Sequence, residues 1–469
     1  MNGRGGWVLL ALAAALVLGV GIDRRELDGT TAFYGALARQ VAETGELAPL
    51  HHGPAVYVLK PPLVIWATAG LYELFGVAPW TSTFVSRLFG VLCVLLTARL
   101  AARRAGPRAG AWAAVTMLVA VPFLENAVTL RLDTAMIAGI LLAMVALTEA
   151  RGAWRPVGFF GGVALATLAK GLPGLLPLGL ALVVWWDERT VRRDWALASL
   201  LLAPVVAWFA FVQATTGSAV AQIVTDLATG HDRGALSWAA SAVEHVVLDP
   251  IVAAPHVALA AALAVRSTWQ RRRSTSRARR REDLVLLLWL VAVVAAATLK
   301  PSHRVRYLLP ALPVLAVWIG GWLAITRPRW RPRAVVAALG VLGLVSFLVP
   351  ASWWPANHRS GEARATMVER LAAEAPDAPV LLIEREARPR YGRQWAGRDW
   401  AYLHLGREVR PVDVEDLAGS AGQWAVLHES VARHVPSSLR DATVVRTPNA
   451  RLLRVPDSIS RPGTASTTP

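Results

Sequence analysis

The chain has 469 residues, of which 55% are apolar and only 17% are charged, and its mean hydropathy is +0.42. Ordinary globular chains contain about 45–50% apolar and about 25% charged residues, so this composition excludes intrinsic disorder and a small disulfide scaffold. It favours an integral membrane protein. The net charge of +17 would also suit a nucleic-acid-binding protein, so the positions of the basic residues decide between the two classes.

Apolar segments of 14–20 residues alternate with short polar gaps along most of the chain. A helix needs about 20 residues to cross the hydrocarbon core of a bilayer. The pattern therefore predicts an α-helical polytopic membrane protein with about 11 transmembrane helices. The predicted spans are residues 7–22, 84–102, 110–124, 133–149, 157–170, 172–186, 196–213, 250–265, 284–299, 306–325 and 334–352.

The arginines are concentrated in the gaps on one side of the predicted spans. If the N-terminus is cytoplasmic, the five cytoplasmic gaps after the first span contain 21 arginines and no lysine. This is the positive-inside pattern, so the basic excess predicts membrane orientation and contact with membrane lipids, with no nucleic-acid partner. The gaps are residues 99–108, 151–155, 189–193, 266–281 and 327–333.

The first extracytoplasmic loop, residues 23–83, is long and contains two candidate helices. Residues 31–44 and 63–75 are predicted to be helical, and the second segment is apolar but too short to span a bilayer. We expect both helices to lie along the membrane surface. The whole of residues 1–352 is predicted to form the transmembrane domain.

The composition changes near Trp353, after the last apolar segment. Residues 353–457 contain charged residues, prolines and four short β-type runs after a helix-like stretch. This pattern predicts a small extracytoplasmic α/β domain. Residues 458–469 are rich in Ser, Thr and Pro and are predicted to be disordered.

Four clusters of polar residues fall on the extracytoplasmic side, where ionisable groups near the membrane are costly unless paired or solvated. In the first cluster, Asp28 precedes a helix that carries Tyr34 and Arg39. An isolated carboxylate beside an external cleft suits a general base. Asp28 also suits the N-cap of that helix, and the two roles are compatible.

The second cluster is Tyr57-Val58-Leu59-Lys60-Pro61-Pro62. The two prolines predict a helix start, where Lys60 and backbone N–H groups together would suit a phosphate. The alternative for Lys60 is a lysine that extends to the membrane interface.

The third cluster contains Arg131 and Asp133 at the start of a span, together with Lys170 at the end of another. These residues are candidates for phosphate binding or catalysis. Structural ion pairing is the alternative for Arg131 and Asp133, and interfacial extension is the alternative for Lys170.

The fourth cluster contains three cations within seven residues, together with a histidine and a tyrosine. Its members are Lys300, His303, Arg304, Arg306 and Tyr307. They lie on the side that should be poor in positive charge, which favours an external anion such as a lipid phosphate over a purely structural role.

These clusters, in this order, resemble the polyprenyl-phosphate-sugar-dependent glycosyltransferases of the GT-C fold. The similarity is greatest to the branch with the aminoarabinose transferase of lipid A and the dolichyl-phosphate-mannose-protein mannosyltransferase-like proteins (glycosyltransferase family 39 and relatives). The resemblance covers about residues 20–325. It rests on Tyr34-Gly35-Ala36-Leu37-Ala38-Arg39, Lys60-Pro61-Pro62-Leu63-Val64-Ile65-Trp66, Leu74-Phe75-Gly76, Arg87-Leu88, Arg131-Leu132-Asp133, Leu168-Ala169-Lys170-Gly171 and Tyr307-Leu308-Leu309-Pro310-Ala311-Leu312-Pro313.

The resemblance implies a bacterial plasma-membrane enzyme that moves a sugar from a polyprenyl-phosphate donor to a lipid, glycan or protein acceptor, with inversion. Asp28 would take or orient the acceptor proton, and Asp133 would share that role or orient a cation. The donor phosphate would be held by cations and Tyr307, and the acceptor or sugar by other polar residues. The phosphate candidates are Lys60, Arg131, Lys170, Lys300, Arg304, Arg306 and Tyr307, and the acceptor or sugar candidates are Tyr34, Arg39, Tyr57 and His303.

The sequence departs from the family pattern at two acidic positions. The family has Asp-Glu where this chain has Asp28-Gly29, and an acidic residue where this chain has Leu59. Some relatives bind a divalent metal with such acids, so no metal and no other cofactor is predicted here. Two other functions stay open: a transporter or flippase of lipid-linked sugars, and a non-catalytic membrane subunit.

Overall fold

The computed structural model divides the chain into two compact units. The first contains Met1–Val20, Ala48–Val64 and Phe84–Phe347, and the second contains Gly21–Leu47, Ile65–Thr83 and Leu348–Pro469. The residues that the structure describes are 4–22, 27, 29–52, 55–149, 154–185, 193–217, 243–248, 255–271, 277–299, 305–326, 331–348, 360–374, 380–384, 396–405, 409–432, 435–447 and 450–457.

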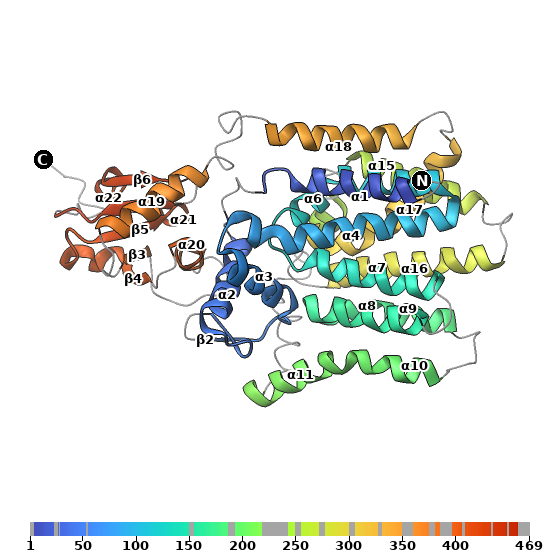
Figure 1. Ribbon diagram of the computed structural model, residues 1–469, viewed down its shortest axis with the longest axis horizontal. Coiled ribbons are helices and arrows are strands. Elements are labelled where there is room, and N and C mark those ends of the chain that lie inside the picture. The colour runs from blue at the N-terminus through green and yellow to red at the C-terminus, as the bar shows by residue number, and fades with distance from the viewer. Residues whose placement is uncertain are drawn as a thin grey trace, which may run out of the picture. The chain divides into compact units, whose positions relative to one another are not determined.

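The first unit is a bundle of helices (Figure 1). Lipid offers no hydrogen-bond partners to the backbone, so an apolar segment in a membrane satisfies its own N–H and C=O groups by forming a helix. Each of the eleven predicted apolar segments overlaps a helix. The helices are α1 (Arg4–Gly19), α4 (Pro79–Ala105), α5 (Pro107–Val119), α6 (Val121–Ala127), α7 (Asp133–Glu149), α8 (Trp154–Lys170), η1 (Leu172–Leu175), α9 (Leu176–Trp185), α10 (Arg193–Ala198), η2 (Ser199–Leu202), α11 (Ala203–Thr216), η3 (Val243–Leu248), α15 (Pro255–Arg271), α16 (Arg277–Leu299), η5 (Val305–Ala311), α17 (Leu312–Thr326) and α18 (Pro332–Leu348).

Several of these helices are long enough to cross a membrane. Within the described residues, four helical stretches have the required length and hydropathy, and a fifth is obtained if α5 and α6, bent by 73°, form one span. The four stretches are Pro79–Ala105, Asp194–Thr216, Arg280–Leu299 and Val305–Thr326. These spans confirm a membrane protein, and the number of eleven crossings stays a prediction.

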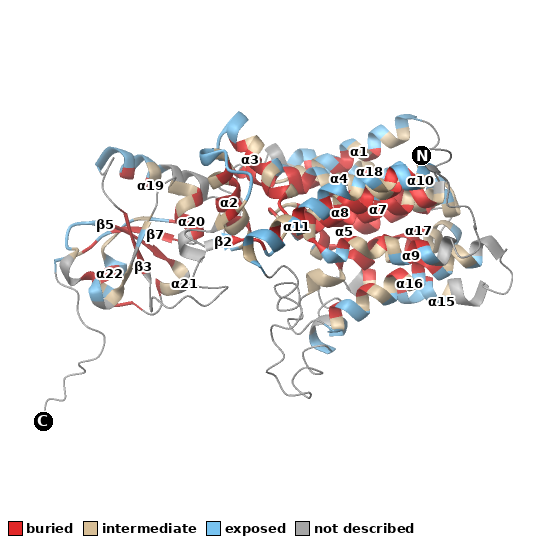
Figure 2. Cartoon of the chain, turned by 90° about the horizontal axis from the view of Figure 1, so that it is seen from below, coloured by how far each residue is buried: buried red, intermediate tan, exposed pale blue. Residues whose placement is uncertain are grey.

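Glycines allow α7 and α8 to pack with their backbones in close contact. A Cβ atom on Gly139 would lie 2.5 Å from the backbone nitrogen of Ala166, and one on Gly162 would lie 2.5 Å from the backbone nitrogen of Ala143. Small residues at this spacing are typical of helix pairs in membranes, where close van der Waals packing drives association. Burial is concentrated along α7 and α5 (Figure 2).

Arg87 in α4 ties together the ends of neighbouring segments. Its guanidinium is buried and donates to the backbone oxygens of Leu18, Val20 and Val128, with the last two contacts at 3.3 Å. The carbonyls at helix ends lack partners within their own helix, so this arginine satisfies groups that would otherwise be costly to bury.

The second unit combines helices from the first extracytoplasmic loop with a small α/β fold. The predicted loop helices are present as α2 (Thr30–Thr44) and α3 (Leu63–Phe75, of which Ile65 onward belongs to this unit). The later elements are α19 (Ser360–Glu374), β3 (Val380–Glu384), α20 (Ala396–Leu405), β4 (Val409–Asp413), η8 (Val414–Gly419), β5 (Trp424–His428), α21 (Glu429–Ala432), α22 (Ser437–Asp441), β6 (Thr443–Arg446) and β7 (Ala450–Arg454).

These strands form a five-stranded sheet in the order β4-β3-β5-β7-β6. Strand β3 pairs in parallel with β4 and β5, and β7 pairs antiparallel with β5 and β6. The four predicted β-type runs correspond to β3, β5, β6 and β7. Strand β4 was not predicted because its sequence, Val-Arg-Pro-Val-Asp, contains a proline and two charges, which a strand tolerates at the edge of a sheet.

Contacts between α2 and α20 explain why the loop helix belongs to this unit. Arg39 donates to the backbone oxygen of Leu403 at 2.8 Å, and the Tyr402 hydroxyl donates to Glu43 at 2.6 Å. Gly35 leaves room for Leu403, whose methyl carbons would lie 2.9 Å from a Cβ at that position. The loop helix therefore packs on a part of the chain that lies more than 350 residues away in sequence.

Candidate active site

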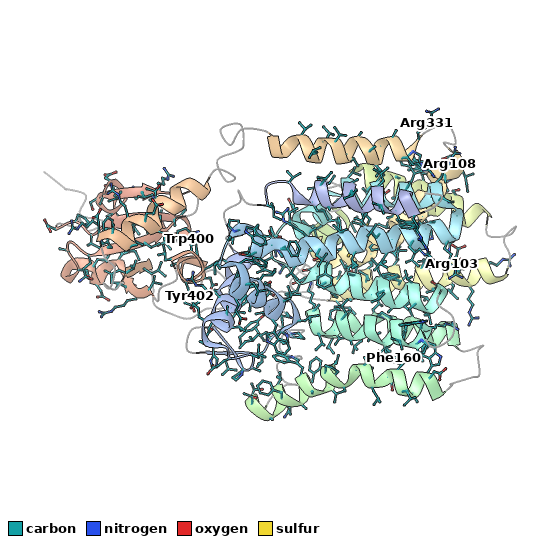
Figure 3. The ribbon with its side chains drawn as sticks, viewed as in Figure 1. Arg103, Arg108, Phe160, Arg331, Trp400 and Tyr402 are labelled. Carbon is teal, nitrogen blue, oxygen red and sulfur yellow. The ribbon has the colours of Figure 1, made fainter. Side chains whose placement is uncertain are left out.

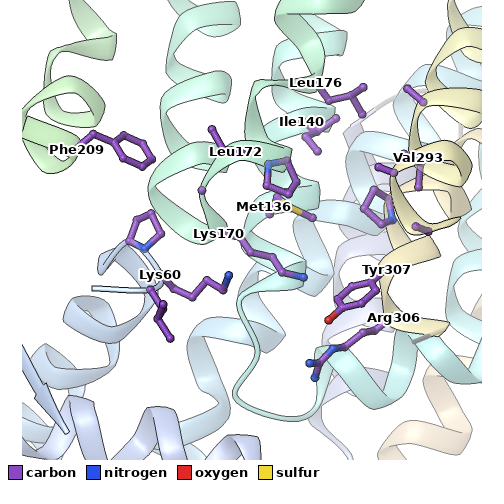
Figure 4. A pocket seen from close by; sticks show the side chains of 18 of the residues that line it. Lys60, Met136, Ile140, Lys170, Leu172, Leu176, Phe209, Val293, Arg306 and Tyr307 are labelled. Atoms are coloured by element: carbon purple, nitrogen blue, oxygen red, sulfur yellow. The ribbon is translucent and has the colours of Figure 1, made fainter. Parts of the chain in front are cut away.

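A cavity of about 620 Å³ lies within the first unit and gathers three cations (Figure 4). Its wall includes Lys60 from the loop after β2 (Ala55–Tyr57), Lys170 from the end of α8, and Arg306 and Tyr307 from η5. In Figure 4, Lys60 and Lys170 extend into the same space, with Tyr307 and Arg306 across it. We refer to this space as the large cavity.

The end of α8 is shaped to bring Lys60 and Lys170 to the same cavity. Gly171 follows Lys170 with φ of +87°, a left-handed conformation that favours glycine, and its N–H bonds to the oxygen of Thr167 at 2.7 Å. A Cβ at Gly171 would lie 3.7 Å from Cδ of Pro61. The turn after α8 therefore packs directly against the loop that carries Lys60.

Lys170 forms a buried ion pair with Asp133. Its ammonium group donates to Oδ1 of Asp133, and the two side chains are only 15% and 5% exposed. Asp133 is the first residue of α7 and Lys170 the last of α8, so the helix dipoles favour both charges where they stand. The glycine contact between α7 and α8 holds the two helices close, which fixes the position of the Lys170 amine.

Tyr307 contacts two of the cations through its ring. The Lys170 nitrogen lies 5.7 Å from the ring centroid, and the Arg306 guanidinium carbon lies 5.6 Å from it. Cations at this distance from an aromatic face are attracted by its quadrupole. The ring therefore lets Lys170 and Arg306 share one wall of the cavity despite their like charges.

The rest of the wall is apolar. It includes Met136 and Ile140 of α7, Leu172 of η1, Phe209 of α11 and Val293 of α16, and no carboxylate is among its described lining residues. The cavity thus places three cations against an apolar wall, and one of them, Lys170, is paired with the carboxylate of Asp133. Such a cavity can bind a phosphate group that is attached to a hydrocarbon chain.

Four of the predicted phosphate candidates, Lys60, Lys170, Arg306 and Tyr307, line the large cavity, and their role in phosphate binding stays a prediction. Arg131 is not among the lining residues, and its backbone N–H and C=O both bond to the Ser86 hydroxyl at 3.0 Å.

Two further candidates, Tyr57 and Asp133, are buried outside the lining. The sequence allows an ion pair between Arg131 and Asp133, and the structure pairs Asp133 with Lys170.

Tyr34 and Arg39 belong to the second unit. Arg39 pairs with Glu43 at 2.6 Å and lies 5.9 Å from the Tyr402 ring centroid, and Tyr34 contacts the Phe33 ring edge-to-face. Their proposed acceptor contacts stay predictions. Asp28, Lys300, His303 and Arg304 lie outside the described residues, so their roles also stay predictions.

The sequence did not indicate the apolar wall. Met136, Ile140 and Leu176 belong to apolar helices in which no residue type distinguishes a cavity-facing position from a lipid-facing one. Phe209 lies in α11, which carried no motif. Within the described residues, no group of three His, Cys, Asp or Glu side chains is placed to hold a metal ion.

Residues 59–212 match the family described as dolichyl-phosphate-mannose-protein mannosyltransferase. This segment contains Lys60, Asp133 and Lys170. The resemblance to the mannosyltransferase-like proteins is confirmed over this segment. No sequence among curated proteins matches the chain.

Several solved structures share the fold of this chain. ArnT from Cupriavidus metallidurans in the apo state aligns with a TM-score of 0.67 at 19% identity, covering 98% of this chain and 99% of that one. The same protein bound to undecaprenyl phosphate gives 0.68 at 18% identity, covering 98% and 100%. The oligosaccharyltransferase of Archaeoglobus fulgidus, tethered with an acceptor peptide, gives 0.52 at 13% identity, covering 92% and 70%.

Proposed function

We propose that this protein is a membrane glycosyltransferase that moves a sugar from a polyprenyl-phosphate donor to a lipid, glycan or protein of the cell envelope. The observation that carries the proposal is the convergence of Lys60, Lys170 and Arg306 in a cavity that is otherwise apolar. The ArnT structure with undecaprenyl phosphate, which has the same fold over nearly all of this chain, supports a polyprenyl phosphate as the ligand.

The charges of the large cavity suit the departing group. When the sugar leaves, the donor phosphate becomes a monoester, which carries about −1.5 to −2 charges at neutral pH. The cations that line the cavity, Lys60, Lys170 and Arg306, attract that anion more strongly than the singly charged diester of the intact donor. Interactions that strengthen as charge develops lower the barrier of the transfer step.

The transfer is a single displacement with inversion. An acceptor hydroxyl or amine forms a bond to the anomeric carbon while the bond from that carbon to the phosphate oxygen breaks, and the electron pair stays on the phosphate. Asp28 takes the acceptor proton in this scheme. Asp133 orients Lys170 toward the leaving phosphate, because its carboxylate is already bonded to that amine.

The proposed topology places the large cavity at the extracytoplasmic face of a bacterial plasma membrane. The N-terminus is cytoplasmic, the chain crosses eleven times, and the arginine-rich gaps face the cytoplasm. Helix α7 supports this placement, since Asp133 beside the large cavity and the arginine-rich gap after Glu149 lie at its opposite ends.

The test is turnover by the purified full chain in lipid nanodiscs with a radiolabelled polyprenyl-phosphate sugar and a cell-envelope extract as acceptor. We expect release of polyprenyl phosphate by the wild type and a large loss in Arg306→Gln. The matched control is Arg331→Gln, which removes an exposed arginine outside the cavity lining. Transfer of the intact donor across the bilayer without cleavage would contradict the proposal and favour a flippase.

A further inference from the structure

Helix α20 belongs to the α/β fold of the second unit and also packs on the loop helix α2. It follows β3 and precedes β4 in the chain, and it contacts β4, β5 and α2. Figure 3 labels two of its residues, Trp400 and Tyr402. All of these elements lie in the same compact unit. Helix α20 therefore links the sheet to the segment that contains α2.

The end of α20 holds the middle of α2 through a network of polar contacts. The Arg39 guanidinium donates both to the backbone oxygen of Leu403 and to the carboxylate of Glu43, which also accepts from the Tyr402 hydroxyl. Carbonyls in the last turn of a helix lack partners within that helix, so Arg39 satisfies one of them. Because Gly35 has no Cβ, the Leu403 side chain can approach the α2 backbone closely.

A further contact holds the chain just before α2. Nε2 of His404 donates to the backbone oxygen of Leu27 at 2.9 Å, since a carbonyl oxygen can only accept. The His404 ring centroid lies 4.9 Å from that of Trp400, whose side chain is fully buried. Leu27 is itself 2% exposed. Both partners of this hydrogen bond are therefore held in place by packing.

The segment held in this way contains the proposed general base. The carbonyl that His404 binds belongs to the peptide group between Leu27 and Asp28. On the other side, Gly29 is the N-cap of α2, and its oxygen accepts the N–H of Phe33 at 3.0 Å. The described neighbours of Asp28 are thus bonded on one side to α20 and on the other to α2. A general base acts only when it is held within reach of the proton that it takes.

We propose that His404 is a positioning residue for sugar transfer, which holds the segment that presents Asp28 to the acceptor. His404 acts through the backbone of Leu27, while Arg39, Glu43 and Tyr402 hold α2 against the same helix. The inference rests on the proposed function only through the role of Asp28. It assigns to the α/β fold of the second unit a direct contribution to the rate of transfer.

The first test compares turnover and lipid binding by the full chain in nanodiscs. His404→Leu removes the donor, so we expect kcat to fall by about 10- to 100-fold, as for a misplaced catalytic group. The affinity for undecaprenyl phosphate should not change, because the phosphate candidates line a cavity of the first unit. Equal losses of kcat and of lipid binding would indicate general unfolding and would overturn the proposal.

Two further variants separate the hydrogen bond from the bulk of the side chain. His404→Gln retains an N–H donor, so we expect it to recover most of the lost kcat. The control Arg410→Gln removes an exposed side chain of β4 and should turn over like the wild type. Wild-type kcat in His404→Leu, or a glutamine variant as slow as the leucine variant, would overturn the proposal.

Hydrogen exchange tests the contact without relying on turnover. We expect the backbone amides of residues 27–33 to exchange several-fold faster in His404→Leu than in the wild type or in Arg410→Gln, because their local opening becomes easier. Unchanged exchange in His404→Leu would overturn the proposal. A wild type that lacks turnover would instead contradict the proposed function, so the two failures are distinguishable.

Discussion

The large cavity and a smaller cavity of about 260 Å³, which is lined by Arg103, Arg104, Arg155 and Arg281 and is called the arginine pocket, share α7, α8 and α16. Their cations arise differently from the sequence. Two cations of the large cavity, Lys60 and Lys170, have no other Lys or Arg close to them in sequence, and the third, Arg306, belongs to the cluster at residues 300–306. Those of the arginine pocket belong to arginine-rich gaps that the positive-inside rule already explains. A lone cation where charge is rare is therefore a stronger sign of function than a run of arginines.

The pairing of charges also differs between the two cavities, and breaking the Asp133–Lys170 pair should have the largest effect. In Asp133→Ala the buried Lys170 loses the carboxylate to which it is bonded, so we expect a loss of about 3–5 kcal/mol in the free energy of unfolding. Denaturant titration in mixed micelles measures it. The double variant Asp133→Leu/Lys170→Met removes both charges, so most of the lost stability should return while turnover stays absent. If stability does not return, an unpaired buried charge is not the cause of the loss in Asp133→Ala.

Loss of a single cation from the large cavity should impair turnover without unfolding the protein. We expect Lys60→Ala to lower kcat by about 100- to 1000-fold, the cost of one lost donor to a developing anion. Initial rates of polyprenyl phosphate release report the effect, and Arg331→Gln is the control. A Lys60→Ala protein with wild-type kcat would remove Lys60 from the site.

The packing of α7 on α8 is the feature that both cavities depend on. In Gly162→Ala the added methyl group would lie 2.5 Å from backbone atoms of α7, so we expect a loss of about 1–3 kcal/mol in the free energy of unfolding. The adjacent Gly161→Ala is the matched control, because its Cβ would meet only a Leu201 methyl at 4.0 Å. Equal effects at the two positions would mean that backbone freedom, and not close packing, explains the loss.

The Tyr307 ring should contribute a smaller effect. Tyr307→Leu removes the contacts with Lys170 and Arg306, and we expect donor binding to weaken by about 0.5–2 kcal/mol. Isothermal titration with a polyprenyl phosphate measures this loss. Tyr307→Phe retains the ring and should bind close to the wild type; a loss as large as in the leucine variant would assign the role to the hydroxyl group.

The ion pair at the arginine pocket should matter least. Asp283→Asn removes one partner of Arg104, but Glu282 lies 3.7 Å from the same guanidinium and is 40% exposed. Arg104 and Asp283 are only 9% and 15% exposed, but Glu282 still compensates the Arg104 charge, so we expect a loss of about 1 kcal/mol in the free energy of unfolding, as for one lost hydrogen bond. A loss comparable to that of Asp133→Ala would show that Glu282 does not compensate for the lost carboxylate of Asp283.

Much of the helical unit could be predicted from the sequence, because apolar periodicity reports directly on segments that cross lipid. The convergence of Lys60, Lys170, Arg306 and Tyr307 was also predictable, since isolated charges near membrane depth need a partner or a ligand. The partner of Lys170 could not be predicted. Asp133 lies 37 residues away, and Gly139 and Gly162, which bring the helices together, look like ordinary small residues in apolar helices.

The second unit was harder to predict. Helix α2 packs on residues more than 350 positions later in the chain. No sequence pattern near Arg39 or Leu403 indicates that the two residues are in contact. Strand β4 lies at the edge of the sheet and contains a proline, so its sequence does not resemble that of a typical strand. Long-range pairings of this kind depend on complementary surfaces, which a single sequence does not specify by pattern alone.

The most direct test of the central claim is binding of undecaprenyl phosphate to the full chain in nanodiscs, compared with undecaprenol, which lacks the phosphate. We predict one bound undecaprenyl phosphate per protein and at least about a hundredfold weaker binding in Lys60→Gln/Arg306→Gln, since each charge-assisted contact contributes about 1.5–3 kcal/mol. Undecaprenol should bind no more tightly to the wild type than to the double variant. Equal affinity of the wild type and the double variant for undecaprenyl phosphate would contradict the account.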